Sequence, residues 1–376
     1  MEVFKFGGAS VRDAESVENV AKIVSLNKHK ELLIVVSAMG KTTNALEQLT
    51  EAYVNGSDDV HVIFEDVKQY HQTILNGLFQ ESHPIHDEVA NAFVEIDWIL
   101  EDEPHEDFDF NYDQIVSIGE LVSSKILSAY LNTTDLQNEW LDARSFIQTD
   151  NTYREGQINW DKTCGLINES IPPMLKKRFI VTQGFIGGTS ENFTTTLGRE
   201  GSDYSAAVFA SCLGADAVTI WKDVPGILNA DPKRFNATRK YNELPYSEAL
   251  EMAYYGATVI HPKTIKPLQN AGIPLLVRPF LTPEESGTIV TETSVVVDTP
   301  SVIVKPGQVL LSLSAKDFSF ITEDHLSSIF RTFADLSIKI NAIQISALSF
   351  SACFDWNSKR FTELSTILDH EFKLKY

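Results

Sequence analysis

Short apolar segments alternate with longer helical patterns over residues 1–280 of the 376-residue chain. The short segments are rich in Val, Ile and Phe without strict polar alternation, which is typical of strands buried on both faces. This order predicts an α/β domain in which helices cover both faces of a mostly parallel sheet. The expected strands are Val3–Phe6, Leu32–Ser37, Phe179–Thr182, Ala217–Trp221 and Pro274–Val277, and the expected helices are Ala14–Leu26, Thr43–Val54, Val60–Phe79, His86–Leu100, Glu120–Leu131, Asp203–Leu213, Ser247–Tyr255 and His261–Asn270.

A turn-rich segment containing Pro283, Gly287 and Pro300 precedes a change in this order. We place a domain boundary near Thr293–Thr299, which divides the chain into residues 1–295 and 300–376. The second part predicts a β-α-β-β-α-β succession, the layout of a small ferredoxin-like module. Its expected strands are Val309–Ser314, Ile338–Ser346, Leu348–Asp355 and Phe372–Tyr376, and its expected helices are His325–Asp335 and Phe361–His370.

Acidic residues outnumber basic ones, with 52 Asp and Glu against 31 Lys and Arg and a net charge of −21. Non-specific binding to nucleic acid or to an anionic membrane needs a positive surface, so this balance disfavours both kinds of partner. An anionic substrate would need a local basic site inside an acidic protein. Each basic motif is therefore a candidate for such a site.

The sequence predicts a soluble, cytoplasmic protein. The longest strongly apolar run, Leu32–Ala38 with Met39, is far shorter than the ~20 residues of a membrane-spanning helix. The amino terminus does not resemble a secretory signal. Cys164, Cys212 and Cys353 lie far apart in the sequence and form no disulfide framework, so we expect reduced thiols.

The segment from Gln69 to Ser124 contains 13 acidic residues and no Lys or Arg. His83, His86 and His105 lie in the same segment, so a metal site is conceivable. We favour a solvated acidic face on a helical insertion, because no ligand spacing repeats a known metal pattern.

Lysine and two glycines follow the first expected strand, in Lys5-Phe6-Gly7-Gly8-Ala9-Ser10. The glycines allow the backbone to approach an anion, and Lys5 supplies a compact charge suited to phosphoryl transfer. The motif is neither a Walker loop nor GxGxxG. A tight turn is the structural alternative.

Two further motifs lie where a strand or loop leads into a helix. The first motif could bind a polar ligand or could simply cap the helix, and the cap is the simpler interpretation. Its sequence is Ser37-Ala38-Met39-Gly40-Lys41-Thr42-Thr43-Asn44. Glu120, in Gly119-Glu120-Leu121, either complements the helix dipole or pairs with a substrate ammonium.

The most specific motif runs from Thr194 to Ala207 and delivers Arg199 just before a helix that opens with Ser202 and Asp203. The planar guanidinium of arginine suits a carboxylate or a phosphate. Trp221–Ile227 and Asp231–Arg234 then suggest either a nucleotide loop or a surface turn with solvated charges. In the segment Gly256–Lys263 we expect His261 to begin a helix rather than to act as a base.

In their order and separation these motifs resemble the aspartate kinases of the amino acid kinase superfamily, over about Val3 to Val290. The carboxy-terminal module resembles an ACT domain. The resemblance implies a three-layer amino acid kinase fold followed by a ferredoxin-like regulatory domain. It also implies transfer of the ATP γ-phosphoryl group to the β-carboxylate of L-aspartate, which opens lysine, threonine and methionine biosynthesis.

The same resemblance assigns roles to individual residues. Lys5, with Gly7 and Gly8, would stabilise the transferring phosphoryl group, and Asp203 would hold Lys5. A carboxylate acceptor is already ionised at pH 7, so no general base is needed. Arg199 would bind the aspartate α-carboxylate and Glu120 its ammonium, while Ser37 and Thr43 would line the amino-acid pocket.

On the other side of the site, Ser202 would face the phosphates. The nucleotide would be bound by Lys222, Asp223, Lys233, Arg234 and Thr258. Mg²⁺ would be bridged mainly by the phosphates, with no dedicated protein ligands.

The chain departs from the family pattern at four positions. Ala9 replaces a threonine and Glu200 a glycine, so the Glu200 carboxylate must point away from Arg199. Lys222 stands where many members have threonine, and Thr258 where many have a nucleotide-contacting lysine. Lys222 and Thr258 are therefore expected to compensate for each other.

Only one ACT-like module fits in the sequence, where many aspartate kinases have two. The resemblance implies a homodimer, with a feedback amino acid bound at the ACT region near Ser319, Thr322, His325 and Asn341. A neutral Asn341 weakens the case for lysine. Two other functions stay open: a kinase for another acidic amino acid or a nucleoside monophosphate, and a non-catalytic amino-acid sensor.

Overall fold

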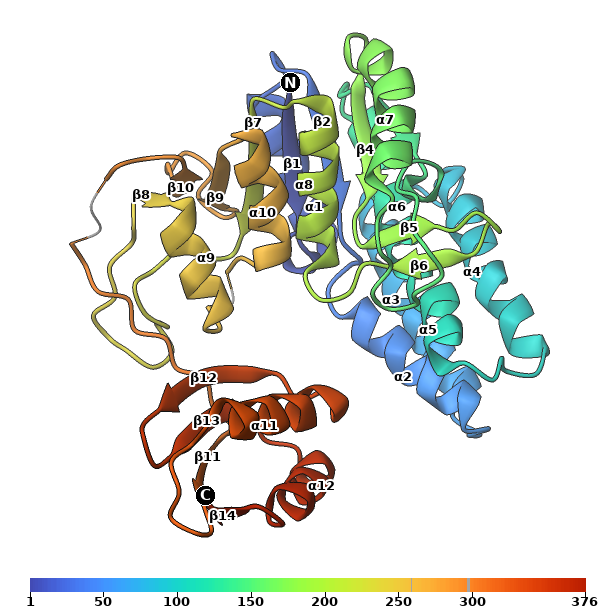
Figure 1. Cartoon of the computed structure of the whole chain (residues 1–376). Coiled ribbons are helices and arrows are strands. Elements are labelled where there is room, and N and C mark those ends of the chain that lie inside the picture. The colour runs from blue at the N-terminus through green and yellow to red at the C-terminus, as the bar shows by residue number, and fades with distance from the viewer. Residues whose placement is uncertain (258, 296–297) are drawn as a thin grey trace. The chain divides into compact units, whose positions relative to one another are not determined.

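The computed structural model describes residues 1–257, 259–295 and 298–376 (Figure 1). The chain divides into two compact units, Met1–Val302 and Ile303–Tyr376. None of the described helices combines the length and apolarity needed to cross a lipid bilayer.

In the described part of the first unit, eight strands form one sheet in the order β3-β4-β2-β1-β7-β9-β10-β8. Neighbouring strands are parallel except for β9 and β10. The predicted mostly parallel sheet is therefore confirmed, and the carboxyl ends of its central strands meet at one edge. The strands are β1 Glu2–Phe6, β2 Leu32–Val36, β3 Asn138–Leu141, β4 Phe179–Gln183, β7 Ala217–Lys222, β8 Glu243–Pro245, β9 Leu275–Pro279 and β10 Thr288–Thr291, with a separate hairpin of β5 Ile186–Gly188 and β6 Thr194–Thr196.

Helices cover both faces of this sheet, and the central strand β2 is therefore buried along its whole length. Helix α8 packs on β1 and β2 beside α7 and α10, whereas α6 packs on β2, β3 and β4 and contacts α1 and α4 (Figure 1). The helices are α1 Ala14–Leu26, α2 Thr42–Val54, α3 Val60–Leu78, α4 Ile85–Glu101, α5 Phe108–Val116, α6 Ile118–Thr133, α7 Trp160–Leu175, α8 Gly201–Leu213, α9 Tyr246–Tyr254 and α10 Pro262–Ala271, with single 3₁₀ turns at Gly8–Val11 and Ala143–Ser145.

Helix boundaries follow local capping chemistry. Helix α1 has the bounds that the sequence predicts, because the Asp13 side chain accepts a hydrogen bond from Ser16 N–H at 2.8 Å. His261 caps α10 by accepting from Lys263 N–H, which confirms it as a helix-start residue.

Helices α5 and α7, the strands β3, β8 and β10, and the β5–β6 hairpin were not predicted. Helix α7 ends in a turn containing Pro172 and Pro173, and such a pair usually breaks a helix. Its buried residues Thr163, Ile167, Ile171 and Leu175 nevertheless recur every four positions. That spacing is the signal that would have identified the helix.

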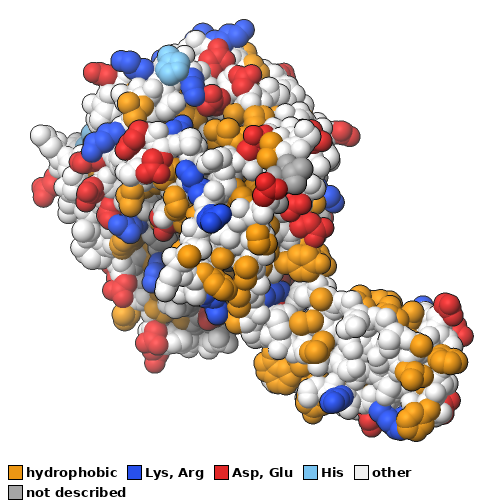
Figure 2. All heavy atoms as spheres, turned by 90° about the vertical axis from the view of Figure 1, so that its left-hand side faces the viewer, with side chains coloured by type: hydrophobic (Ala, Val, Ile, Leu, Met, Phe, Trp, Pro, Cys, Tyr) orange, Lys and Arg blue, Asp and Glu red, His pale blue; other side chains and the backbone are white. Residues whose placement is uncertain are grey.

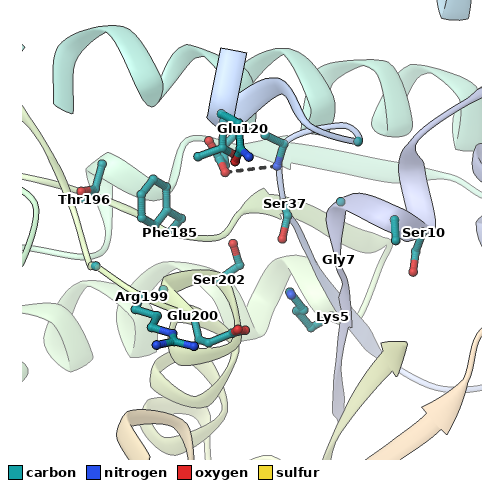
Figure 3. A pocket seen from close by; sticks show the side chains of 18 of the residues that line it. Lys5, Gly7, Ser10, Ser37, Glu120, Phe185, Thr196, Arg199, Glu200 and Ser202 are labelled. Carbon is teal, nitrogen blue, oxygen red and sulfur yellow. Dashed lines mark hydrogen bonds between the residues drawn. The ribbon is translucent and has the colours of Figure 1, made fainter. Parts of the chain in front are cut away.

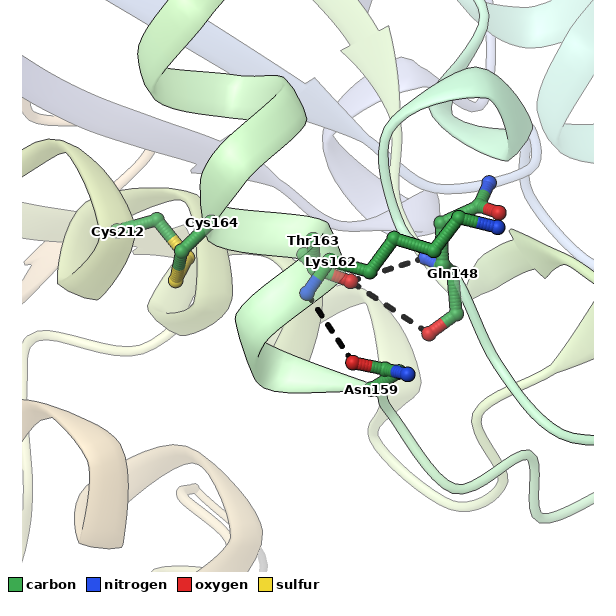
Figure 4. Close-up of a disulfide and its surroundings, with 6 residues drawn as sticks. All are labelled: Gln148, Asn159, Lys162, Thr163, Cys164 and Cys212. Carbon is green, nitrogen blue, oxygen red and sulfur yellow. Dashed lines mark hydrogen bonds between the residues drawn. A yellow bond between two sulfur atoms is a disulfide. The ribbon is translucent and has the colours of Figure 1, made fainter.

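The expectation of three reduced cysteines is wrong. Cys164 of α7 and Cys212 of α8 form a disulfide (Figure 4). Cys353 is free. The separation of 48 residues between Cys164 and Cys212 gives no hint of this pairing, because it arises from the packing of the two helices.

Reducing this disulfide should lower the melting temperature by several degrees. Closing a loop of this length restricts the unfolded chain and typically contributes roughly 2–4 kcal/mol to stability. Calorimetry with and without dithiothreitol measures the shift, and Cys212→Ser should reproduce it while Cys353→Ser should not. An unchanged melting temperature on reduction, or in Cys212→Ser, would contradict the prediction.

The second unit has the ferredoxin-like succession that the sequence predicts. Its antiparallel sheet has the order β12-β13-β11-β14, and two helices cover one face around a core that includes Leu313, Phe333 and Phe350. The elements are β11 Gln308–Ala315, α11 Glu323–Asp335, β12 Ile340–Ile345, β13 Phe350–Asp355, α12 Ser358–Leu368 and β14 Phe372–Lys375.

The acidic segment, Gln69 to Ser124, forms the second half of α3, all of α4 and α5, and the start of α6. His83 and His105 each accept a backbone hydrogen bond, from Ile85 and Asp107 respectively, and His86 contacts the Gln72 side chain. Across residues 1–257, 259–295 and 298–376, no group of three His, Cys, Asp or Glu side chains is arranged to hold a metal ion.

Candidate functional site

A cavity of about 800 Å³ opens at the carboxyl edge of the parallel sheet (Figure 3). The ends of β1, β2 and β7 contribute Lys5, Ser37 and Lys222 to its lining. Helices α2, α6 and α8 contribute Thr43, Glu120 and Ser202 from their first turns. Ligands of parallel α/β sheets bind at this edge, where strand ends and helix starts converge.

Gly7 and Gly8 also line the cavity. A Cβ atom on Gly8 would lie 2.8 Å from the Ala38 carbonyl oxygen and 2.9 Å from that of Gly40. The loop after β1 therefore approaches the loop after β2 at a distance that only glycine allows.

Lys5 and Lys222 share one buried carboxylate. The Lys5 Nζ lies 2.5 Å from Asp203 Oδ1, and the Lys222 Nζ lies 3.1 Å from Asp203 Oδ2. Burial favours the neutral acid, but the two lysine charges outweigh it and hold the pKa of Asp203 below its ordinary value. Asp203 itself is fully buried beneath the cavity, so it positions the two ammonium groups that face the cavity.

Glu120 lines the cavity and carries a buried oxygen without a hydrogen-bond partner among the described residues. Its Oε1 accepts a hydrogen bond from Ala38 N–H at 3.1 Å, whereas its buried Oε2 has no hydrogen-bond partner in the described part of the chain. Burial raises the pKa of Glu120 to about 8, although the Ala38 bond and the Lys5 charge act in the opposite direction. A ligand cation at Oε2 would satisfy both the orphaned oxygen and the carboxylate charge.

Arg199 follows the positive-φ residue Gly198 and reaches the cavity from the loop before α8. No described residue pairs with its exposed guanidinium. Glu200 also lines the cavity beside Arg199 (Figure 3), and its carboxylate lies 3.9 Å from the Lys222 Nζ. The guanidinium N–H groups of Arg199 are therefore free to bind an anionic ligand.

The expected nucleotide-binding residues are only partly brought together. Lys222 and Asp223 line the cavity, whereas Lys233 and Arg234 lie outside it, in the loop after β7. Arg234 pairs with Asp231 at 3.7 Å. Thr258 lies outside the described residues. Lys222 also donates to the Val259 carbonyl and, despite its burial, has a raised pKa because Asp203 and Glu200 are close.

Other lining residues were missed from the sequence, above all Arg154. Its guanidinium lies 4.1 Å from the Tyr112 ring centroid, and its Nη2 lies 3.0 Å from Glu47 Oε1. Arg154 belongs to an irregular loop without periodicity, which explains the omission. The other lining residues outside the motifs of the sequence analysis are Glu47, Tyr112, Glu155 and Phe185.

The sequence profile of the amino acid kinase family matches residues 1–279. The lysine-sensitive aspartokinase 3 of Escherichia coli is 31% identical over 357 residues, which cover 94% of this chain and 78% of that protein. The chain belongs to the aspartokinases of the amino acid kinase family. Aspartokinase 2 of Arabidopsis thaliana is 30% identical, with 99% of this chain and 71% of that protein covered.

Solved aspartokinase structures share the fold of the chain. Aspartokinase III of Escherichia coli, in complex with aspartate and ADP, superposes with a TM-score of 0.83 at 28% identity over 100% of this chain and 85% of that chain. The same enzyme in complex with lysine and aspartate gives 0.83 at 29% identity, over 100% and 84% of the two chains. The expected aspartokinase fold is thereby confirmed.

Proposed function

We propose that this protein transfers the γ-phosphoryl group of ATP to the β-carboxylate of L-aspartate and releases 4-phospho-L-aspartate and ADP. Arg199 binds the substrate α-carboxylate, and Glu120 binds its ammonium through Oε2. Ser37 and Thr43 line the amino-acid pocket. These contacts leave the β-carboxylate to face Lys5, with reacting groups held in one orientation.

One observation supports this assignment most strongly. Lys5, Arg199 and Glu120 all line one cavity, and Glu120 has a buried oxygen without a hydrogen-bond partner among the described residues (Figure 3). An α-amino acid with a second carboxylate carries the three complementary charges. A nucleoside monophosphate lacks the ammonium that the buried Glu120 would pair with, so an amino-acid acceptor is favoured.

Charge stabilisation supplies the catalysis in this mechanism, because an ionised carboxylate needs no base. Lys5 neutralises charge on the transferring phosphoryl group, with backbone N–H groups of Gly7 and Gly8 and the start of α8 at Ser202. Lys222, which shares Asp203 with Lys5, acts as a second ammonium on the phosphate side. This role would compensate for the absence of lysine at position 258.

The nucleotide enters as its Mg²⁺ complex. Asp223 is the cavity-lining carboxylate on the nucleotide side, and a metal held mainly by phosphates needs few protein ligands. We propose that Lys233 and Arg234 bind the nucleotide from the loop after β7, and that Thr258 is a further contact.

An acceptor panel tests the function. The protein with MgATP should form ADP with L-aspartate, and much more slowly with glutamate, N-acetylglutamate or UMP. Preference for another acceptor would overturn the aspartate assignment. Tight binding of lysine or threonine with no turnover on any acceptor would favour the amino-acid sensor.

We propose a cytoplasmic homodimer formed through the carboxy-terminal ACT-like unit, which begins at Ile303. Its edge strand β12 leaves Ile343 and Ile345 exposed, and apolar side chains are visible on the surface of this unit (Figure 2). An unpaired strand edge of this kind favours pairing with a second copy. Sedimentation at several protein concentrations distinguishes dimer from monomer.

We also propose that this unit binds a feedback amino acid. Thr322 and His325 form a capping box at the start of α11, whereas Asn341 bonds with Gln308 and Asp355. Initial velocities with added lysine or threonine test whether either amino acid inhibits.

A further inference from the structure

Asp113 of α5 is a buried carboxylate with no assigned role in the reaction. Its side chain is fully buried and does not line the cavity. Its Oδ2 accepts hydrogen bonds from Arg154 N–H at 2.9 Å and Thr196 N–H at 2.8 Å, and its Oδ1 accepts from the Thr196 hydroxyl at 2.7 Å. All three donors belong to segments that do line the cavity.

The first segment carries Arg154. This residue has a φ of 63°, a left-handed conformation that non-glycine residues rarely adopt. The hydrogen bond from its own N–H to Asp113 fixes that conformation. The guanidinium lies over the Tyr112 ring and contacts Glu47, which both line the cavity, and it also pairs with Asp109 Oδ1 at 3.6 Å.

The second segment leads to Arg199. Thr196 ends β6, and Arg199 follows three residues later. Gln114, next to Asp113, donates to the Thr194 carbonyl and accepts from Thr194 N–H, so α5 is bonded to β6 at two successive residues. Gly156 N–H donates to the Thr196 carbonyl and joins the two segments directly.

We infer that Asp113 is a positioning residue. It fixes the loops of Arg154 and Arg199 relative to each other, at the end of the cavity that binds the amino acid. This inference rests on the proposed function, because it assumes that this end binds the acceptor. Three bonds to one carboxylate fix two loops relative to one helix. Burial raises the pKa of Asp113 to about 6, so near pH 7.5 the group is ionised and able to accept all three bonds.

Asp113→Ala should raise the KM for aspartate about tenfold or more, because charge-assisted bonds to two loops are lost. The KM for MgATP should change less than about threefold. Asp113→Asn should restore the KM for aspartate to within about threefold of the wild type, since its amide oxygen can accept both N–H bonds and its amide nitrogen can donate to Thr196.

Thr163→Val is the matched control for a general loss of stability. Thr163 is equally buried and accepts a bond from Gln148 N–H at 3.0 Å, but it lies outside the cavity. Its loss should lower the melting temperature and leave both KM values unchanged. Arg154→Gly keeps the N–H and suits the positive φ, and by removing the guanidinium it should raise the KM for aspartate even if Asp113→Ala does not fold.

An unchanged KM for aspartate in Asp113→Ala or Arg154→Gly would overturn the inference. An equal rise in both KM values, or an asparagine variant as impaired as the alanine one, would do so too. The wild type in the same assay distinguishes failure of the proposed function from failure of this inference. A wild type that does not phosphorylate aspartate refutes the proposed function. Normal wild-type turnover with unaffected variants refutes only the role of Asp113.

Discussion

Binding of L-aspartate at pH 7 should release close to one proton from the protein. Burial raises the pKa of Glu120 to about 8 when no substrate is bound, so at pH 7 most of these carboxyls are protonated. The substrate ammonium at Oε2 favours the ionised form, so its arrival expels the proton. Aspartate affinity should therefore fall as the pH drops below 8, by up to about tenfold per unit.

Calorimetric titration in two buffers of different ionisation enthalpy measures this release. Glu120→Gln should abolish it and weaken aspartate binding by about tenfold or more, because an amide cannot neutralise an ammonium. Glu155→Gln is the matched control: this carboxylate also lines the cavity but is largely exposed, and its loss should leave proton release intact. Equal release by the wild type and Glu120→Gln would refute the role of Glu120.

Lys5→Met should lower kcat by about a thousandfold or more while aspartate still binds. Removing the ammonium takes away charge stabilisation in the transition state but leaves Arg199 and Glu120 in place. The fold should tolerate the change, since Asp203 keeps its contact with Lys222. Steady-state kinetics and aspartate titration on the same preparation measure the two effects.

Lys222→Met should reduce kcat less, by about ten- to a hundredfold, because Lys5 still faces the phosphates. Lys30→Met is the control, since this lysine pairs with Glu2 at the amino end of β1, away from the cavity edge. A Lys5 variant that retains more than a tenth of the wild-type kcat would remove Lys5 from the mechanism.

Strong periodicity and local capping made much of the fold predictable. The five strands expected in the first unit all exist, and α1 has the expected bounds because Asp13 caps it. The β-α-β-β-α-β succession of the second unit was predictable for the same reason: each of its elements is short, periodic and bounded by turns.

Features that depend on tertiary packing were not predictable. The Cys164–Cys212 disulfide exists because α7 and α8 are neighbours, which no spacing in the sequence reports. The sequence does not distinguish Asp113 from the other acids of its segment. What sets it apart is that it accepts hydrogen bonds from Arg154 and Thr196, which are distant in the sequence. Likewise the pairing of Lys222 with Asp203 and Glu200 became visible only in the structure.

A crystal structure with L-aspartate and MgADP would test most directly whether one cavity serves both substrates. We expect the aspartate α-carboxylate on Arg199, its ammonium on Glu120 and its β-carboxylate toward Lys5, between the amino acid and the ADP phosphates. Aspartate bound away from Arg199, or phosphates bound away from Lys5, would contradict the mechanism proposed for this protein.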